Sequence, residues 1–216
     1  ALKERQVELI ITVDNGISSV EEVDYAKSLG LDVVITDHHR PQKQLPAAVA
    51  VVDPYREDCP SPFKGFSGVG VAFKLISALE GPDCDIQSLL ENYADLLAIG
   101  TVADVVPLKG ENRSFVSQGL KQLEHTDRIG LQALLEQSGM EGKELTAGNI
   151  AFTVVPRINA TGRIGSPDRA VALLTSEDPE ETQMLCRQIC EDNDYRRKIE
   201  SEIYEEAVAI LNREPE

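Results

Sequence analysis

The chain has 216 residues, 42% of them hydrophobic, so a sizeable core can form and disorder of the whole chain is excluded. Its net charge of −16 argues against a protein that coats nucleic acid without selectivity. No apolar run approaches the roughly 18 residues needed to cross a bilayer, and the first residues lack the features of a signal peptide. The four cysteines are not spaced as in a zinc finger, so reduced thiols are expected. We therefore expect a cytoplasmic protein with no membrane partner.

The first quarter of the sequence predicts parallel strands joined by a helix. Short runs rich in branched apolar residues predict buried strands, and these lie at residues 7–13, 31–37 and 47–54. The segment between the first two has helical periodicity, with Ser18 and Glu21 in capping-box spacing and Gly30 as a stop signal. A crossover of this length between consecutive strands implies that they are parallel.

The rest of the chain is predicted to be mainly helical. Residues 151–178 predict an extended piece, a Gly/Arg loop and a short helix, and residues 112–138 predict helices broken at Gly130 and Gly139. Further helices are expected at residues 68–81, 85–106 and 179–211. The fold class is therefore α/β: a parallel sheet flanked by helices, then a helical lobe and a long C-terminal connecting helix. The expected boundaries are about 1–106 for the α/β part, 107–178 for the lobe and 179–216 for the connecting helix.

Metal-competent side chains follow the first two predicted strands. Asp14 ends the first strand, and Asp37, His38 and His39 end the second. Function collects at the carboxyl ends of strands in open parallel sheets, and carboxylates with imidazoles but no thiolate favour Mn²⁺ or Mg²⁺. Asp104, in the apolar stretch AIGTVADVVPL, needs a cation or a hydrogen-bond network if it is buried. Each residue alone has a plainer interpretation: turn formation, surface polarity or helix capping.

Two glycine-rich segments are ambiguous from the residues alone. RINATGRIG places Arg157, Asn159, Thr161 and Arg163 close together, and its arginines suit phosphate oxygens or neighbouring carboxylates equally well. The glycines of GFSGVGVAF suit a phosphate at a helix N-terminus, although tight helix packing is the more frequent use.

Several of these motifs together resemble a known family. TVDNG, VITDHH and GTVADVVPL resemble three motifs of the DHH phosphoesterase superfamily. FSGVGVAFKLISAL and VVPRINATGRIGSPDRAVALL resemble its RecJ branch of 5′-to-3′ exonucleases specific for single-stranded DNA. The resemblance covers nearly the whole chain in order, and it implies metal-dependent hydrolysis of phosphodiesters in DNA recombination and repair.

The resemblance also implies roles for individual residues. Asp14 would bridge two Mn²⁺ or Mg²⁺ ions roughly 3.5–4 Å apart, with His38 and Asp104 as ligands of one of them. His39 would face the scissile phosphate, and Asp37 would be a ligand or would orient a histidine. Arg157, Asn159 and Arg163 would lie near the DNA backbone. Single-stranded DNA is the expected partner, with other DNA-repair proteins as further candidates.

One family motif is missing from its expected place. The Asp-x-Asp pair on an earlier strand does not precede residues 7–13, and the C-terminal substrate-binding domain of the family does not follow the long helix. We therefore expect the central fragment of a RecJ-like protein. Two other hypotheses stay open: a phosphoesterase acting on oligoribonucleotides or small nucleotides, and a catalytically inactive DHH-type binding module.

Overall fold

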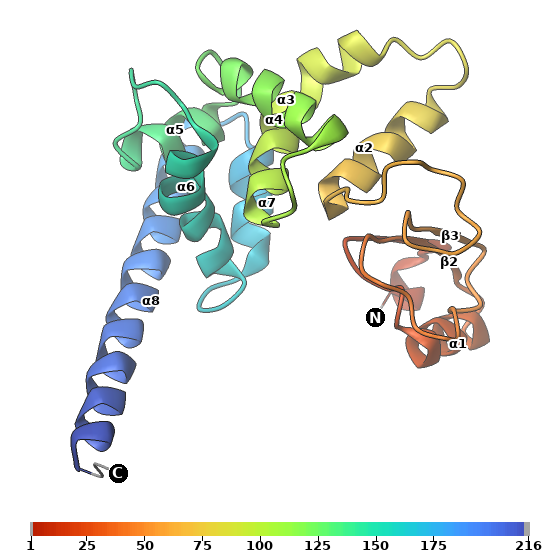
Figure 1. The fold of residues 1–216 in the computed structure, drawn as a ribbon, viewed down its shortest axis with the longest axis horizontal. Coiled ribbons are helices and arrows are strands. Elements are labelled where there is room, and N and C mark those ends of the chain that lie inside the picture. The colour runs from red at the N-terminus through yellow and green to blue at the C-terminus, as the bar shows by residue number, and fades with distance from the viewer. Residues whose placement is uncertain (1, 214–216) are drawn as a thin grey trace. The chain divides into compact units, whose positions relative to one another are not determined.

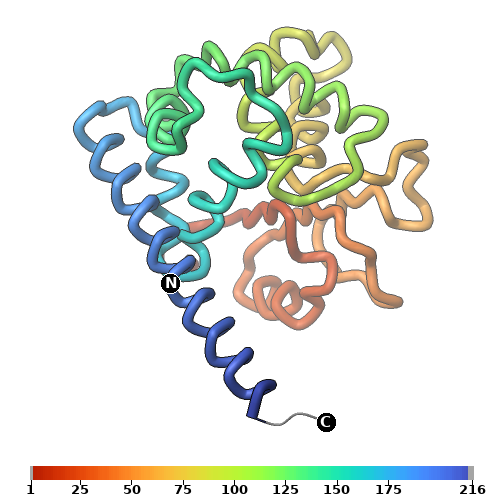
Figure 2. Tube along the Cα trace, turned by 60° about the vertical axis from the view of Figure 1, so that its left-hand side comes forward, coloured from red at the N-terminus to blue at the C-terminus, as the bar shows by residue number. Residues whose placement is uncertain are grey.

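The structure is a computed structural model that describes residues 2–213. The chain divides into two compact units, Ala1–Gln122 and Leu123–Glu216, and each unit is described by itself (Figures 1 and 2). The domain boundaries expected near residues 106 and 178 remain predictions. Within residues 2–213, no helix combines the length and the apolar character that crossing a membrane requires.

A three-stranded parallel sheet forms the base of the first unit, which confirms the predicted α/β class. The strands are β1 (Leu9–Val13), β2 (Asp32–Thr36) and β3 (Ala50–Val52), in the order β1-β2-β3 and preceded by a short 3₁₀ turn, η1 (Lys3–Arg5). Helix α1 (Val20–Ser28) covers one face, where Val23 and Ala26 pack against Val33 and Ile35 of β2. The register pairs Val13 with Thr36 and Thr36 with Val52, so the three strands end side by side.

Two details of the first crossover differ from the prediction. Strand β1 was expected to be buried, but Leu9, Ile11 and Val13 are 47%, 50% and 47% exposed. The reason is that β1 lies at the edge of the sheet and α1 covers only the opposite face. The predicted capping box is also wrong: Ser19 precedes α1, and it makes no side-chain hydrogen bond to the helix.

Three helices complete the first unit: α2 (Gly68–Leu79), α3 (Ile86–Ala103) and α4 (Gly110–Leu123). Asp85 is the N-cap of α3, and its carboxylate accepts from the backbone N–H groups of Gln87 and Ser88. The helices enclose a second core built from the apolar side chains Phe66, Val71, Phe73, Leu89, Leu90, Ala94, Leu97 and Phe115. The helices predicted at residues 68–81 and 85–106 are thus confirmed, with slightly earlier ends.

The second unit contains α5 (Ile129–Gln137), α6 (Ala147–Thr161), α7 (Pro167–Thr175) and α8 (Pro179–Arg213). The long C-terminal helix is confirmed, and its first half packs against the other three helices while its second half extends away from them (Figures 1 and 2). The buried positions of α8 end at Asn193. All four cysteines of the chain are free.

The prediction for residues 151–161 is wrong. Instead of an extended piece and a loop, these residues belong to α6, which continues through Pro156. A reciprocal capping box between Thr146 and Asn149 starts the helix four residues before the branched run that suggested a strand. Gly130 is also not a helix break: it lies inside α5, where a Cβ would stand 1.9 Å from the backbone oxygen of Leu173.

Candidate metal centre

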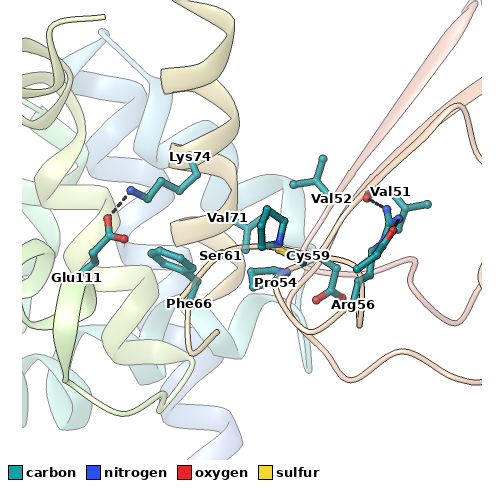
Figure 3. Close-up of a pocket in the computed structure, with 13 residues that line it drawn as sticks. Val51, Val52, Pro54, Arg56, Cys59, Ser61, Phe66, Val71, Lys74 and Glu111 are labelled. Carbon is teal, nitrogen blue, oxygen red and sulfur yellow. Dashed lines mark hydrogen bonds and ion pairs between the residues drawn. The ribbon is translucent and has the colours of Figure 1, made fainter. Parts of the chain in front are cut away.

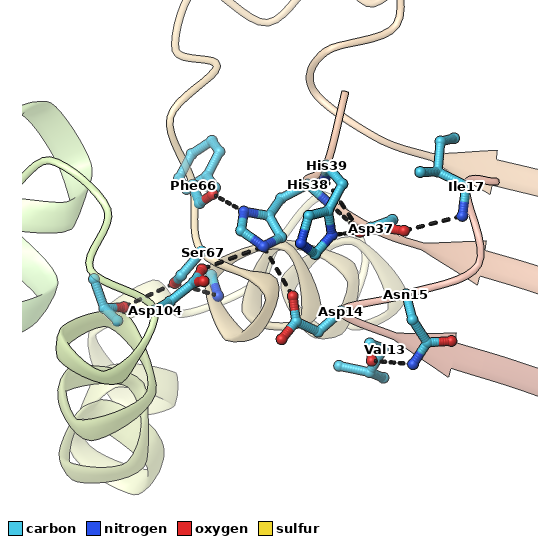
Figure 4. Close-up of polar contacts among 12 residues, drawn as sticks. Val13, Asp14, Asn15, Ile17, Asp37, His38, His39, Phe66, Ser67 and Asp104 are labelled. Atoms are coloured by element: carbon cyan, nitrogen blue, oxygen red, sulfur yellow. Dashed lines mark hydrogen bonds and ion pairs between the residues drawn. The ribbon is translucent and has the colours of Figure 1, made fainter. Parts of the chain in front are cut away.

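The carboxyl edge of the sheet brings Asp14 and Asp37 together. Asp14 follows β1 and Asp37 follows β2, and the backbone N–H of Asp14 donates to the carbonyl of Thr36 over 3.0 Å. Asp14 has a φ of 65°, which directs the chain sharply out of the strand. Few non-glycine residues adopt this conformation, and aspartate is one of those that tolerate it. Figure 4 shows the resulting cluster.

Asp37 is the buried anchor of this cluster, with 1% of its surface exposed. One carboxylate oxygen accepts from the backbone N–H of Ile17 over 2.9 Å, and the other from the backbone N–H of His38 over 2.7 Å. The second oxygen also lies 2.7 Å from Nδ1 of His39. Burial raises the pKa of Asp37, but these donors outweigh it and the pKa is lowered overall. Asp37 therefore stays ionised and holds both histidines in place.

The imidazole of His38 has a defined orientation. Its Nδ1 lies 2.9 Å from the carbonyl oxygen of Phe66, and because a carbonyl can only accept, Nδ1 carries the proton. In the neutral ring, Nε2 therefore presents a lone pair, and it faces Asp14 Oδ1 at 2.8 Å and Asp104 Oδ2 at 3.3 Å (Figure 4). Nε2 of His38 and Oδ2 of Asp104 are both buried without a hydrogen-bond partner among the described residues. Three electron-rich atoms at these distances are the arrangement that a bound cation would stabilise.

Asp104 reaches the cluster from the end of α3. The helix predicted over residues 85–106 would place Asp104 in its interior. In the structure Asp104 is instead the C-cap of α3. A carboxylate is unfavourable at a helix C-terminus because the helix dipole is negative there, and α3 has no basic residue in its last turn. The next residue, Val105, has a φ of 58°, a strained conformation for a branched side chain. The unfavourable helix dipole and the strained backbone both destabilise the end of α3. Such features are typical of residues that bind a ligand.

The N-terminus of α2 closes the site against Asp14. A Cβ on Gly68, the first residue of α2, would lie 2.3 Å from the Asp14 carboxyl carbon, so only glycine permits this approach. The glycines of GVGV therefore serve close packing, since Gly70 also lies against the side chains of Ser67 and Phe66.

The pKa of Asp14 reflects its surroundings. Burial raises this pKa, the nearby His38 lowers it, and the Asp104 carboxylate raises it.

The donors suit a divalent cation. Ligand atoms of Asp14, Asp37, His38 and His39 all lie within 4.8 Å of one another, and Asp104 joins them through His38. Carboxylate oxygens with imidazole nitrogens and no sulfur suit Mn²⁺ or Mg²⁺. The orphaned atoms of His38 and Asp104 are the positions that such an ion would satisfy.

The predicted phosphate-binding residues belong to the second unit. Arg157 and Asn159 lie on α6, and Arg163 follows it. Asn159 and Arg163 are exposed, whereas Arg157 is half-buried and donates to the carbonyls of Thr153 and Gln137.

Arg157 also lies near the cysteine pair of α8. A hydrogen bond from the Cys186 thiol and the Arg157 guanidinium together lower the pKa of Cys190 to about 6, against the effect of burial.

Sequence reasoning missed Asp53, which directly follows β3 just as Asp14 and Asp37 follow β1 and β2. Its position at the end of a predicted strand is the sequence feature that could have identified it. Asp53 is 3% exposed, and Oδ1 accepts from the backbone N–H of Tyr55 over 2.7 Å while Oδ2 has no hydrogen-bond partner among the described residues. Burial raises its pKa.

Asp53 also lines a cavity of about 510 Å³ beside the metal centre (Figure 3). The walls are mainly apolar and include Phe66, whose carbonyl orients His38. The cations at the wall are paired, Lys74 with Glu111 and Arg56 with Asp58.

Comparison with known proteins shows what this chain is similar to. Residues 1–101 match the model of the DHH family, N-terminal domain. The chain is 45% identical over 214 residues to the single-stranded-DNA-specific exonuclease RecJ of Bacillus subtilis, and 40% identical over 219 residues to that of Escherichia coli. These matches cover 99% and 97% of the chain but only 26% and 38% of the two relatives, so the chain spans a minor part of their length.

A solved structure agrees with the sequence comparison. A crystal structure of exonuclease RecJ bound to manganese superposes with a TM-score of 0.80 at 37% identity, over 92% of this chain and 50% of that one. The resemblance drawn from the sequence motifs is thus confirmed. The chain is similar over nearly its whole length to RecJ single-stranded-DNA-specific exonucleases, and its residues 1–101 match the model of the DHH family, N-terminal domain.

Proposed function

We propose that this chain carries the metal centre of a 5′-to-3′ exonuclease that hydrolyses single-stranded DNA with Mn²⁺ or Mg²⁺. The observation that supports this most is the convergence of the Asp14 and Asp104 carboxylates on the buried Nε2 of His38. The relatives supply the substrate class, because each is named as a single-stranded-DNA-specific exonuclease. A neighbouring structure is described as bound to manganese, which agrees with the donor set found here.

In the proposed centre, Asp14, His38 and Asp104 would hold the cation, and by the family resemblance Asp14 would be the carboxylate shared between two ions. Bound divalent cations of this kind activate water and neutralise the charge that develops on a phosphodiester during hydrolysis. The Phe66 carbonyl keeps the proton of His38 on Nδ1, so Nε2 is ready as a ligand. The proposed catalytic residues beside the ligands are His39 and Asp37.

His39 is suited to contact the phosphate. Its side chain is 60% exposed, and Nδ1 is bound to Asp37. The hydrogen bond to Asp37 raises the pKa of His39, which favours the imidazolium and leaves the N–H at Nε2 to donate to a phosphate oxygen. Asp37 orients this ring and stabilises its charge.

Arg157, Asn159 and Arg163 remain the proposed contacts to the DNA backbone. Asn159 and Arg163 are exposed and offer an amide and a guanidinium to phosphate oxygens. A role in DNA recombination and repair and other repair proteins as partners complete the proposal, and they rest on the family resemblance. A cytoplasmic location is also proposed, and it rests on cysteines whose pattern is typical of reduced thiols.

The test uses the complete protein with Mn²⁺ and single-stranded DNA that has a free 5′ end. Wild-type protein is expected to release nucleotides from that end, and Asp14→Ala or His38→Ala to lose activity by about 100-fold or more, since even outer partners of metal ligands are worth 10–100-fold. Asp24→Ala, on the exposed face of α1, is the control and should retain full activity.

Three outcomes would contradict the proposal. Undiminished activity of either ligand variant would remove the metal assignment. A preference for dinucleotides over long single strands would favour a small-substrate phosphoesterase. Retention of DNA without hydrolysis at any Mn²⁺ concentration would indicate an inactive binding module.

A further inference from the structure

The metal centre combines residues from two segments that no β-ladder joins. Asp14 and His38 come from the sheet, and His38 is oriented by Phe66, which precedes α2. Asp104 comes from the end of α3 and leads into residues 104–109, which contain no helix or strand. The distance between His38 and Asp104 therefore depends on how the segment around Phe66 is held against the segment after Asp104.

One side chain links these two segments directly. Asn112, in the first turn of α4, is fully buried, with 0% of its surface exposed. Its Nδ2 donates to the carbonyl of Gly65 over 2.6 Å and to the carbonyl of Pro107 over 3.2 Å. Gly65 adjoins Phe66, and Pro107 lies three residues after Asp104. Both amide protons of Asn112 are thus used to join the two halves of the site.

A second buried contact joins the same segments. The hydroxyls of Ser67 and Thr101 lie 2.9 Å apart, and both residues are 0% exposed. Ser67 follows Phe66 and caps α2, whereas Thr101 lies in the last turn of α3 before Asp104. The Asn112 hydrogen bonds and the Ser67–Thr101 contact thus both hold the segment around Phe66 against the segment around Asp104.

The chemistry of the Asn112 side chain indicates that its N–H groups are required at this position. Its Oδ1 is buried without a hydrogen-bond partner among the described residues, a cost that an apolar side chain would avoid. An aspartate has the same shape but no N–H group, and its charge would face two carbonyl oxygens. A primary amide donates to both carbonyls from one uncharged nitrogen. The strained Val105 lies between Asp104 and Pro107, and such a conformation persists only where the surrounding structure holds it.

We propose that Asn112 is a positioning residue that sets the separation of Asp104 from His38 and thereby the affinity of the site for divalent cations. It touches neither cation nor substrate and acts through Gly65 and Pro107, with the Ser67–Thr101 contact as a second support. This inference rests on the proposed metal-dependent function, but it predicts a property that is measured without nucleic acid.

The experiment is a Mn²⁺ titration of the complete protein by electron paramagnetic resonance of free Mn²⁺, without DNA. Asn112→Ala and Asn112→Asp are expected to weaken Mn²⁺ binding roughly 10–100-fold, the usual effect of removing a partner behind the ligands. Exonuclease activity should fall at limiting Mn²⁺ and recover at saturating Mn²⁺. A role confined to stability would lower the melting temperature without this recovery.

The matched control is Gln122→Ala, also on α4. The Gln122 side-chain amide donates to the carbonyl of Glu91, so this variant loses the same kind of hydrogen bond away from the metal centre. Its Mn²⁺ affinity should equal that of the wild type. Equal loss of affinity in Gln122→Ala, or unchanged affinity in a folded Asn112→Ala, would overturn the inference.

A further variant decides the matter if the Asn112 variants do not fold. Thr101→Val keeps the shape of the side chain and removes the hydroxyl that contacts Ser67, so it should also weaken Mn²⁺ binding. Unchanged affinity in folded Thr101→Val would then overturn the inference, as would a wild type that binds no Mn²⁺. Normal Mn²⁺ binding by a wild type that lacks exonuclease activity would instead contradict the proposed function alone.

Discussion

The imidazole of His38 donates from Nδ1 to the carbonyl oxygen of Phe66 over 2.9 Å. This single hydrogen bond determines the tautomer of the neutral ring, in which Nε2 presents a lone pair to Asp14 and Asp104. Phe66 and His38 are 28 residues apart, in a loop and at a strand end. The candidate metal centre therefore depends on the approach of the loop before α2 to the edge of the sheet.

Addition of Mn²⁺ should stabilise the folded protein. Without a cation, the carboxylates of Asp14 and Asp104 both face Nε2 of His38, and a bound ion removes this repulsion. At a concentration 100 times the dissociation constant, the free energy of unfolding should rise by about 2.7 kcal/mol. The measurement is thermal unfolding with EDTA and with Mn²⁺. Asp14→Asn should reduce the difference and Asp24→Asn should not; an equal response of both would argue against this site.

Substitution of Gly68 should disturb Asp14. The new Cβ in Gly68→Ala would lie 2.3 Å from the Asp14 carboxyl carbon, so the carboxylate must move. We expect a loss of about 1–3 kcal/mol of unfolding free energy, typical of overpacking, together with weaker Mn²⁺ binding.

Gly148→Ala is the matched control, because Gly148 also lies in the first turn of a helix and a Cβ there meets only the Thr146 hydroxyl, at 3.8 Å. This change should be neutral or stabilise the protein by up to about 1 kcal/mol. Chemical denaturation measures both effects, and a neutral Gly68→Ala would show that Asp14 does not need its observed position.

Asp37 should contribute stability that acid removes. Its carboxylate is buried, which raises the pKa, but its backbone and histidine donors lower it below the ordinary 3.8 overall. A lowered folded-state pKa means that the contribution is complete above the unfolded-state pKa and is lost as the pH falls through the folded-state pKa.

The test is Asp37→Asn in metal-free protein. Near neutral pH it should lose about 1.5–3 kcal/mol, the usual worth of hydrogen bonds to a charged acceptor. Its stability should also change less than that of the wild type between pH 5 and pH 2, by the same linkage. Parallel stability curves for the two proteins over this range would refute the role assigned to Asp37.

Cys190 should be the most reactive thiol of the α8 pair. The Cys186 thiol and the Arg157 guanidinium lower its pKa to about 6. Cys186 should resist labelling because it is 1% exposed and its own pKa is raised by its contact with Cys190 and by burial. Iodoacetamide labelling followed by peptide mass spectrometry should show a midpoint near pH 6 at Cys190. Arg157→Gln should move this midpoint upward, and an unmoved midpoint would show that the guanidinium has no influence.

Much of the fold follows from local patterns. The parallel βαβ unit, the helices at 68–81 and 85–106 and the long C-terminal helix were all predictable, because hydrophobic periodicity and crossover length are properties of contiguous residues. Residues 151–161 were not, since the branched run around Val154 favours a strand while the capping box at Thr146 that overrides it lies outside that run. The exposure of Leu9, Ile11 and Val13 likewise depends on which strands neighbour β1.

The sequence by itself determined the chemical identity of the candidate site: carboxylates and imidazoles at strand ends, and an acid after an apolar helix. Their order along the chain is enough for this, because parallel strands must end at one edge. Only the tertiary structure decided that His38 presents Nε2 to Asp14 and Asp104, that Asp37 is held by backbone donors, and that Asn112 joins the two halves. These facts depend on approaches of a few ångströms between residues far apart in sequence, and packing, not local pattern, sets such distances.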